Sequence, residues 1–143
     1  MTVVAWDGVS MAADRQGEIY TTKTERTKIR RVGALIAGCA GTVRASEAMF
    51  QWFKDGARIG EFPKLVDHDA GLMLVAGVGQ LFLYEGTPYP MYLENKFFAI
   101  GSGGDAAMAA IHLGSDAKHA VEVACAISTG CGGGVDVLTL ETP

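Results

Sequence analysis

Short apolar runs bounded by glycine and other turn-forming residues make up most of this chain, and helical patterns interrupt them in only two places. The runs lie at 2–6, 9–13, 28–32, 34–38, 71–77, 80–86, 97–101 and 135–140. Hairpins dominate, and strand–helix–strand alternation is missing. The order strands, helix, strands, two helices, strand therefore predicts an α+β fold in which two antiparallel sheets pack face to face with helices outside, a four-layer αββα sandwich.

The first two runs are predicted to form a β-hairpin. Asp7 and Gly8 stand between them, and an Asp-Gly pair readily adopts the positive φ angles of a tight two-residue turn. Thr2 then begins a paired strand. The runs at 28–32 and 34–38 are predicted to form a second hairpin, which is broken near Gly33.

Apolar residues recurring at spacings of three and four predict a helix at 42–54. Further along the chain, Asp105 is expected to cap a short helix that runs through Leu113. Ser115 or Asp116 is expected to cap a longer helix after it.

The composition narrows the classes of function. A chain of 143 residues is expected to form one domain, 1–143, with a core that needs no disulfide or metal. The net charge of −4 is scattered, so the chain lacks the basic patch of a nucleic-acid-binding or lipid-binding protein. The sequence shows no signal-peptide pattern and no run of the roughly 18 apolar residues that a membrane helix needs, so we expect a cytoplasmic protein.

The cysteines and histidines do not predict a metal site. Cys39, Cys125 and Cys131 form no CxxC motif, and the three histidines lie at no ligand spacing, so buried thiols, no metal and no cofactor are expected. The 19 glycines are more informative, because they gather in AGCAG, GSGG and GCGGG. Such clusters indicate places where the backbone turns sharply or approaches another group closely.

Six segments in the same order give the chain a family resemblance. They are Thr2 after Met1, VSMAAD, TKIRRVG, AGCAG, FAIGSGG and HAVEVACAIS. In these segments the sequence resembles the proteasome β-subunit family of N-terminal nucleophile (Ntn) hydrolases, and is closest to the bacterial HslV-type threonine peptidases. The segments cover most of the chain, so the resemblance implies the Ntn-hydrolase sandwich and a threonine nucleophile at residue 2.

The chemistry of such a nucleophile explains why Met1 has to be removed. A threonine hydroxyl is a weak nucleophile in water and needs a base within hydrogen-bond reach. A free α-amino group has a pKa of about 8, so a substantial fraction is neutral and able to accept a proton at cellular pH. While Met1 remains, however, the nitrogen of Thr2 is an amide without a basic lone pair.

The resemblance implies roles for four further residues. Lys28 would lie beside the threonine hydroxyl as a cation that lowers its pKa, and Asp14 would orient that lysine. Gly41 would point its backbone N–H at the oxyanion, and Ser102 would support the amino terminus and its proton relay. From the residues alone, Lys28 also fits a solvated strand position and Asp14 a strand end, while Gly41 fits an ordinary turn and Ser102 a loop.

The sequence departs from the family pattern in two places. Where proteasome β subunits have Asp-x-x-Ser-Gly-Gly, Ser128 replaces the aspartate and Cys131 the serine; HslV-type peptidases also lack the Asp-x-x-Ser pattern. The family can hold a monovalent cation near here through backbone carbonyls, for which Cys125, Ser128 and Cys131 give no independent indication. The segment 55–70 is short and broken by glycine and proline, so the family's second outer-layer helix is expected to be missing.

Three functions remain open on this basis. The first is a threonine peptidase subunit that cleaves peptides or unfolded proteins within a homo-oligomer, with an unfoldase ATPase as a partner implied by the resemblance. The second is an inactive assembly or scaffold protein of the same fold. The third is an Ntn amidohydrolase that acts on small molecules with the same Thr2 chemistry.

Overall fold

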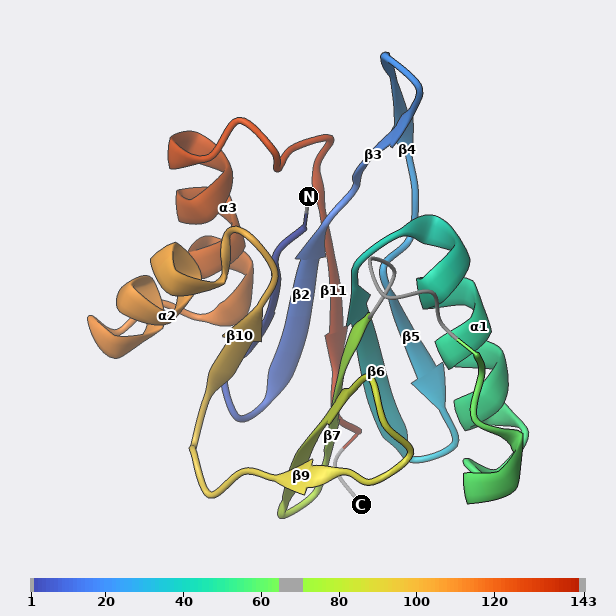
Figure 1. Cartoon of the computed structure of the whole chain (residues 1–143). Coiled ribbons are helices and arrows are strands. Elements are labelled where there is room, and N and C mark those ends of the chain that lie inside the picture. The colour runs from blue at the N-terminus through green and yellow to red at the C-terminus, as the bar shows by residue number, and fades with distance from the viewer. Residues whose placement is uncertain (1, 65–70, 142–143) are drawn as a thin grey trace.

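The computed structural model describes residues 2–64 and 71–141 of the chain. In these residues the first sheet is antiparallel, and the amino-terminal hairpin lies at its centre (Figure 1). Its strands, in order across the sheet, are β10 (Phe98–Ile100), β1 (Val4–Trp6), β2 (Ser10–Asp14) and β11 (Val135–Thr139). The first sheet therefore joins the two ends of the described chain.

The second sheet is also antiparallel, and its strands follow chain order. They are β5 (Ile29–Val32), β6 (Leu35–Ala40), β7 (Leu72–Gly77), β8 (Gln80–Glu85) and β9 (Met91–Tyr92). A separate hairpin, β3 (Gln16–Ile19) and β4 (Thr22–Glu25), connects the first sheet to the second and projects beyond both of them (Figure 1).

Helices cover the outer face of each sheet (Figure 1). Helices α2 (Gly104–His112) and α3 (Ala117–Ile127) lie against the first sheet, and α1 (Val43–Lys54) lies against the second. The order of layers is therefore helix, sheet, sheet, helix. This arrangement confirms the predicted four-layer αββα sandwich.

Side chains alternate along β1 and β2, so that the first sheet packs against helices on one face and against the second sheet on the other. Val3, Ala5 and Ala12 pack against α2 and α3, whereas Val4 and Met11 pack against the second sheet. Successive strand residues point to opposite faces, and here both faces are covered. The strands consequently read as continuous apolar runs rather than as an alternating pattern.

Two local predictions need correction. The central residues of the first turn are Gly8 and Val9 rather than Asp7 and Gly8. Asp7 takes the position before the turn because its carboxylate accepts hydrogen bonds from the amides of Val9 and Ser10. Asp105 lies inside the first turn of α2 and does not cap it, since Gly103 holds the N-cap position.

The caps of the other two helices agree with their predictions. Thr42 caps α1 by accepting a hydrogen bond from the amide of Ala45, and Asp116 caps α3 by accepting one from the amide of His119. A side-chain acceptor at the N-cap satisfies an amide that has no partner within the helix. These caps fix where each helix begins.

The described residues between α1 and β7 form little regular structure. Between α1 and β7, the described residues hold only a 3₁₀ turn, η1 (Ile59–Glu61), and residues 65–70 lie outside the described part. The segment after α1 folds back on it, because the indole of Trp52 donates to the Arg58 carbonyl and its ring meets Phe62 edge-on. Within the described residues, α1 is the one α-helix of this layer, and no helix has the length and apolar character to cross a membrane.

Candidate active site

The backbone of Thr2 is fixed by the segment that follows β10. Its amide nitrogen donates to the Ser102 hydroxyl at 3.3 Å, and its carbonyl accepts from the Gly103 amide at 3.2 Å. Gly101 approaches so closely that a Cβ there would overlap the Thr2 carbonyl oxygen, and its φ is 92°. Position 101 therefore requires glycine, because a side chain would collide with Thr2 and because the positive φ disfavours other residues.

Lys28, which immediately precedes β5, connects Thr2 to Asp14. Its ammonium nitrogen lies 3.1 Å from the Thr2 hydroxyl oxygen and 2.9 Å from Asp14 Oδ1. The side chains of Lys28 and Asp14 are only 2% and 0% exposed. A buried charge is tolerated only when it is paired and hydrogen-bonded, so this ion pair holds the ammonium group against the hydroxyl.

Asp14 is held in turn by backbone donors from three segments. Its Oδ1 accepts a hydrogen bond from the Val3 amide at 3.1 Å, and its Oδ2 accepts from Gln16 at 3.3 Å and Gly132 at 3.2 Å. These amides satisfy both carboxylate oxygens, as a buried polar group requires. The GCGGG segment thus supports the site through the backbone of Gly132.

A pocket of about 690 Å³ opens over these groups. Thr2, Lys28, Gly41 and Ser102 line it together, whereas Asp14 lies behind them in the interior. Gly41 has a φ of 133° and stands between the end of β6 and the Thr42 cap of α1. The structure therefore brings Thr2, Asp14, Lys28 and Ser102 into one hydrogen-bonded cluster and places Gly41 in the same pocket.

Four polar or charged residues of this lining were not predicted as site residues from the sequence. Gln16 and Glu18 come from β3, Arg26 follows β4, and Arg44 lies in the first turn of α1. The strands β3 and β4 carry mostly polar, exposed residues, so no hydrophobic alternation revealed them. Arg44 falls within the helix predicted at 42–54, where its side chain carried no sign of a role in the pocket.

Two thiols, those of Cys125 and Cys39, have a raised pKa. Burial raises the pKa of Cys125 to about 11, and the neighbouring Cys131 adds to the rise. Burial also raises the pKa of Cys39 far above its ordinary value. These groups are thiols at neutral pH rather than nucleophilic thiolates. In the described part of the chain, no three His, Cys, Asp or Glu side chains gather as a metal site would require.

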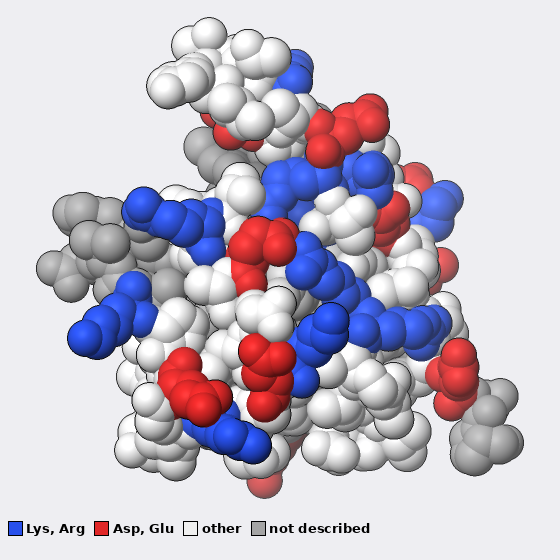
Figure 2. All heavy atoms as spheres, turned by 90° about the vertical axis from the view of Figure 1, so that its right-hand side faces the viewer, with Lys and Arg blue, Asp and Glu red and all other residues white. Residues whose placement is uncertain are grey.

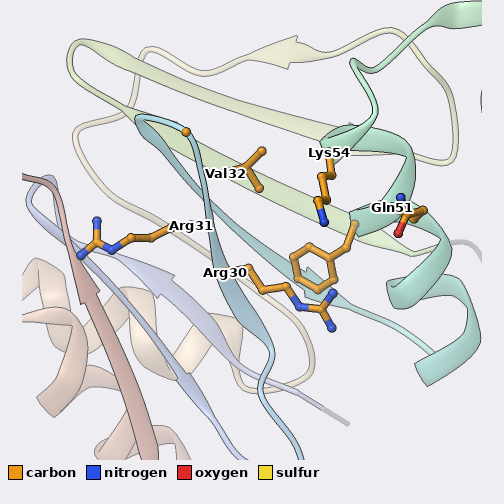
Figure 3. A pocket seen from close by; sticks show the side chains of 7 residues that line it. Arg30, Arg31, Val32, Gln51 and Lys54 are labelled. Atoms are coloured by element: carbon orange, nitrogen blue, oxygen red, sulfur yellow. The ribbon is translucent and has the colours of Figure 1, made fainter.

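A second hollow, of about 460 Å³, lies on the outer face between β5 and α1 (Figure 3). Arg30 points toward α1, where its guanidinium stacks on Phe50 and pairs with Glu47, while Arg31 points away from the helix. Lys and Arg side chains gather across this face with acidic ones between them (Figure 2). None of the five candidate site residues lines this hollow.

Comparison with known proteins gives the fold its context. No protein-family model matches the sequence, and no curated protein matches it. Eukaryotic HslV from Trypanosoma brucei is 22% identical with a TM-score of 0.72, and the match covers 99% of each chain. BPH from Thiobacillus denitrificans is 20% identical with a TM-score of 0.72 over 100% of each chain.

The same BPH in complex with epoxomicin has a TM-score of 0.73 and is 20% identical over 99% of this chain and 100% of that one. At such identities the similarity concerns the arrangement of the backbone, and it extends from one end of the chain to the other. This chain therefore has the HslV-type Ntn-hydrolase fold that the sequence resemblance implied.

Proposed function

We propose that this chain is a threonine-type peptidase subunit in which Thr2, exposed by removal of Met1, supplies both the nucleophile and the base. The observation that carries the proposal is the position of the Lys28 ammonium group between the Thr2 hydroxyl at 3.1 Å and the Asp14 carboxylate at 2.9 Å. A cation held there favours the developing alkoxide, and its own charge is balanced from behind.

The acylation step follows from the chemistry of a free amino terminus. The α-amino group of Thr2 accepts the hydroxyl proton while the oxygen bonds to the peptide carbonyl carbon. The carbon–nitrogen bond of the substrate then breaks, and the amino group passes the proton to the departing amine. An ester between Thr2 and the acyl half of the substrate remains. Ser102, whose hydroxyl lies 3.3 Å from the Thr2 nitrogen, is placed to orient that amino group.

Hydrolysis of the ester uses the same groups. The freed amino group takes a proton from water as the water oxygen attacks the ester carbon, and the proton returns to the threonine oxygen when the acid leaves. In both steps the carbonyl oxygen of the substrate becomes negatively charged. The Gly41 N–H and the positive end of α1, which begins beside Gly41, stabilise this charge.

We further propose a homo-oligomeric chamber in the cytoplasm, supplied with unfolded chains by an ATPase. The pocket over Thr2 opens directly to the surface, so in a single protomer it offers no barrier against folded proteins. A surrounding assembly would supply that barrier. Peptides and unfolded proteins are accordingly the proposed substrates, and small amides are the alternative for a protomer that acts alone.

The test compares the protein with its Thr2→Ala and Thr2→Ser variants on an unfolded, casein-like protein. Hydrolysis is expected for the unchanged protein, reduced hydrolysis for Thr2→Ser, and none for Thr2→Ala. Epoxomicin, the compound present in the BPH complex, is expected to add its mass to the unchanged protein and not to Thr2→Ala. Equal hydrolysis by the unchanged protein and Thr2→Ala would exclude the proposal. Retention of Met1 without hydrolysis would favour the inactive assembly protein.

A further inference from the structure

The pocket over Thr2 contains an arginine that no carboxylate of the described residues pairs with. Arg26 lines this pocket and is half-buried. In the part of the chain that the structure describes, its guanidinium takes part in no ion pair and no side-chain hydrogen bond. A guanidinium carries five N–H donors and cannot lose its charge, so a half-buried one favours an acceptor from outside the chain.

Arg26 is exceptional among the arginines of this protein. The other five all have partners, which are Asp136 for Arg15, Glu47 for Arg30, the Thr139 carbonyl for Arg31, Glu61 for Arg58, and a further contact for Arg44. Four of these arginines lie away from the pocket. Among the described residues, the one guanidinium without an acceptor therefore lines the same pocket as the proposed nucleophile.

The backbone of Gly17 and Arg15 restrains the position of Arg26. A Cβ on Gly17 would lie 2.7 Å from the Arg26 Cδ and 2.9 Å from its Cγ, so the stem lies directly over the Gly17 backbone. The Arg26 amide also donates to the Arg15 carbonyl at 2.9 Å. A long side chain that packs on backbone in this way loses less freedom on binding a ligand than one extended into water.

No other charged side chain of the pocket lining pairs with Arg26 in the part of the chain that the structure describes. Lys28 is paired with the buried Asp14, and Glu18, the one acidic residue in the lining, is exposed and forms no ion pair among the described residues. Arg44 adds a second guanidinium to the lining. Since Arg44 has a contact of its own, Arg26 is the guanidinium of this lining that has no acceptor within the described residues.

We propose that Arg26 is a specificity-determining residue that binds the carboxylate of an aspartate or glutamate side chain close to the scissile bond. The planar fork of a guanidinium matches the two oxygens of a carboxylate, and an uncharged isostere cannot form the same pair. This inference rests on the proposed peptidase function. It assigns the substrate class of the Thr2 site as acidic peptides.

The experiment uses peptides blocked at both ends, so that their only carboxylate is a side chain. They differ by Glu against Gln, placed either directly before or directly after the cleaved bond. The unchanged protein is expected to cleave one Glu peptide with a kcat/KM at least about tenfold above its Gln counterpart, as a charge-assisted hydrogen bond allows. In Arg26→Met the ratio is expected to fall to about one, and in Arg26→Lys to an intermediate value.

Two further variants make the test specific. Arg58→Met removes an exposed arginine outside the pocket and is expected to keep the full ratio. Gly17→Ala keeps Arg26 but displaces its stem, so the ratio is expected to fall as it does in Arg26→Met. An equal rate for the Glu and Gln peptides in the unchanged protein, or an undiminished ratio in Arg26→Met, would overturn the inference.

A binding measurement separates this inference from the proposed function. The Thr2→Ala protein is titrated with fluorescently labelled forms of these peptides, and at low salt it is expected to bind the Glu peptide about tenfold more tightly than the Gln peptide. Selective binding that depends on Arg26, without hydrolysis by the unchanged protein, would support the carboxylate site and exclude the peptidase. Hydrolysis by the unchanged protein without selective binding of the Glu peptide would support the peptidase and exclude the carboxylate site.

Discussion

The ammonium group of Lys28 and the carboxylate of Asp14 form an ion pair of 2.9 Å in the interior of the protein, with both side chains shielded from solvent. Removal of one partner leaves the other charge buried, which costs far more than the pair itself contributes. The same pair positions the Lys28 ammonium group at the Thr2 hydroxyl. Stability and the proposed catalysis therefore depend on the same contact.

Lys28→Met is expected to lower the free energy of unfolding by about 3–5 kcal/mol, because Asp14 is left as an uncompensated buried charge. Urea denaturation at pH 7 measures the change. Lys118→Met is the matched control, since it breaks an exposed i,i+4 pair with Glu122 and is expected to leave the free energy of unfolding almost unchanged. Equal losses in the two variants would contradict a buried, tightly coupled pair.

Gly101→Ala is expected to displace Thr2 and abolish hydrolysis, because the new Cβ would lie 2.7 Å from the Thr2 carbonyl carbon. Gly114→Ala provides the comparison: Gly114 has a similar positive φ of 108°, but its Cβ would meet no atom within 4 Å. This control is expected to lose about 1–2 kcal/mol from backbone strain alone and to keep its activity. Hydrolysis assays and denaturation together separate the two effects. An active Gly101→Ala protein would show that the Thr2 backbone tolerates displacement.

The cap of α1 links helix stability to the pocket. Thr42→Ala removes the acceptor for the Ala45 amide and is expected to cost about 1 kcal/mol. Asp116→Ala removes the equivalent cap of α3, where the Ala117 amide keeps its bond to Asp7, so its cost is expected to be no larger. Only Thr42→Ala is expected to lower kcat, because the start of α1 borders Gly41. A kcat unaffected by Thr42→Ala would show that the start of α1 does not contribute to stabilising the oxyanion.

Much of the fold was predictable because burial leaves a repeating signal in the sequence. The strands of both sheets except β9 lie in apolar runs, and α1 shows its buried face at helical spacing together with its Thr42 cap. The hairpin of β3 and β4 gave no such signal, since it projects from the body and its residues are mostly exposed. Strand β9 is two exposed residues long, too short for any periodicity.

The site was less predictable from local sequence than the fold. Lys28 stands in a basic run with Arg30 and Arg31, and only the packing of β5 against the first sheet brings its side chain to Asp14. Lys28 and Asp14 are 14 residues apart in the sequence, and hydrophobic periodicity does not predict contacts between such segments. The family resemblance supplied the pairing of Lys28 with Thr2. It did not supply Arg26, whose position depends on the β3–β4 hairpin.

The thiol of Cys125 is expected to react slowly with iodoacetamide at pH 8. Its pKa lies at about 11 rather than the ordinary 9.0, chiefly because of burial, so its thiolate fraction is roughly a hundredfold lower. The alkylation rate is expected to rise with pH until about pH 11, as the thiol ionises. Intact-mass measurements over timed reactions at pH 7–11 check this, with unfolded protein as the reference. A folded rate equal to the unfolded rate at pH 8 would contradict it.

The most direct measurement concerns the amino terminus itself. The chain is produced behind a removable fusion partner whose cleavage leaves Thr2 as the first residue, and hydrolysis of an unfolded protein is followed before and after release, with the mass recorded each time. Activity is expected only in the released form, because only there does Thr2 carry a basic amino group. Equal activity while Thr2 is still joined through a peptide bond would contradict a mechanism in which its own nitrogen is the base.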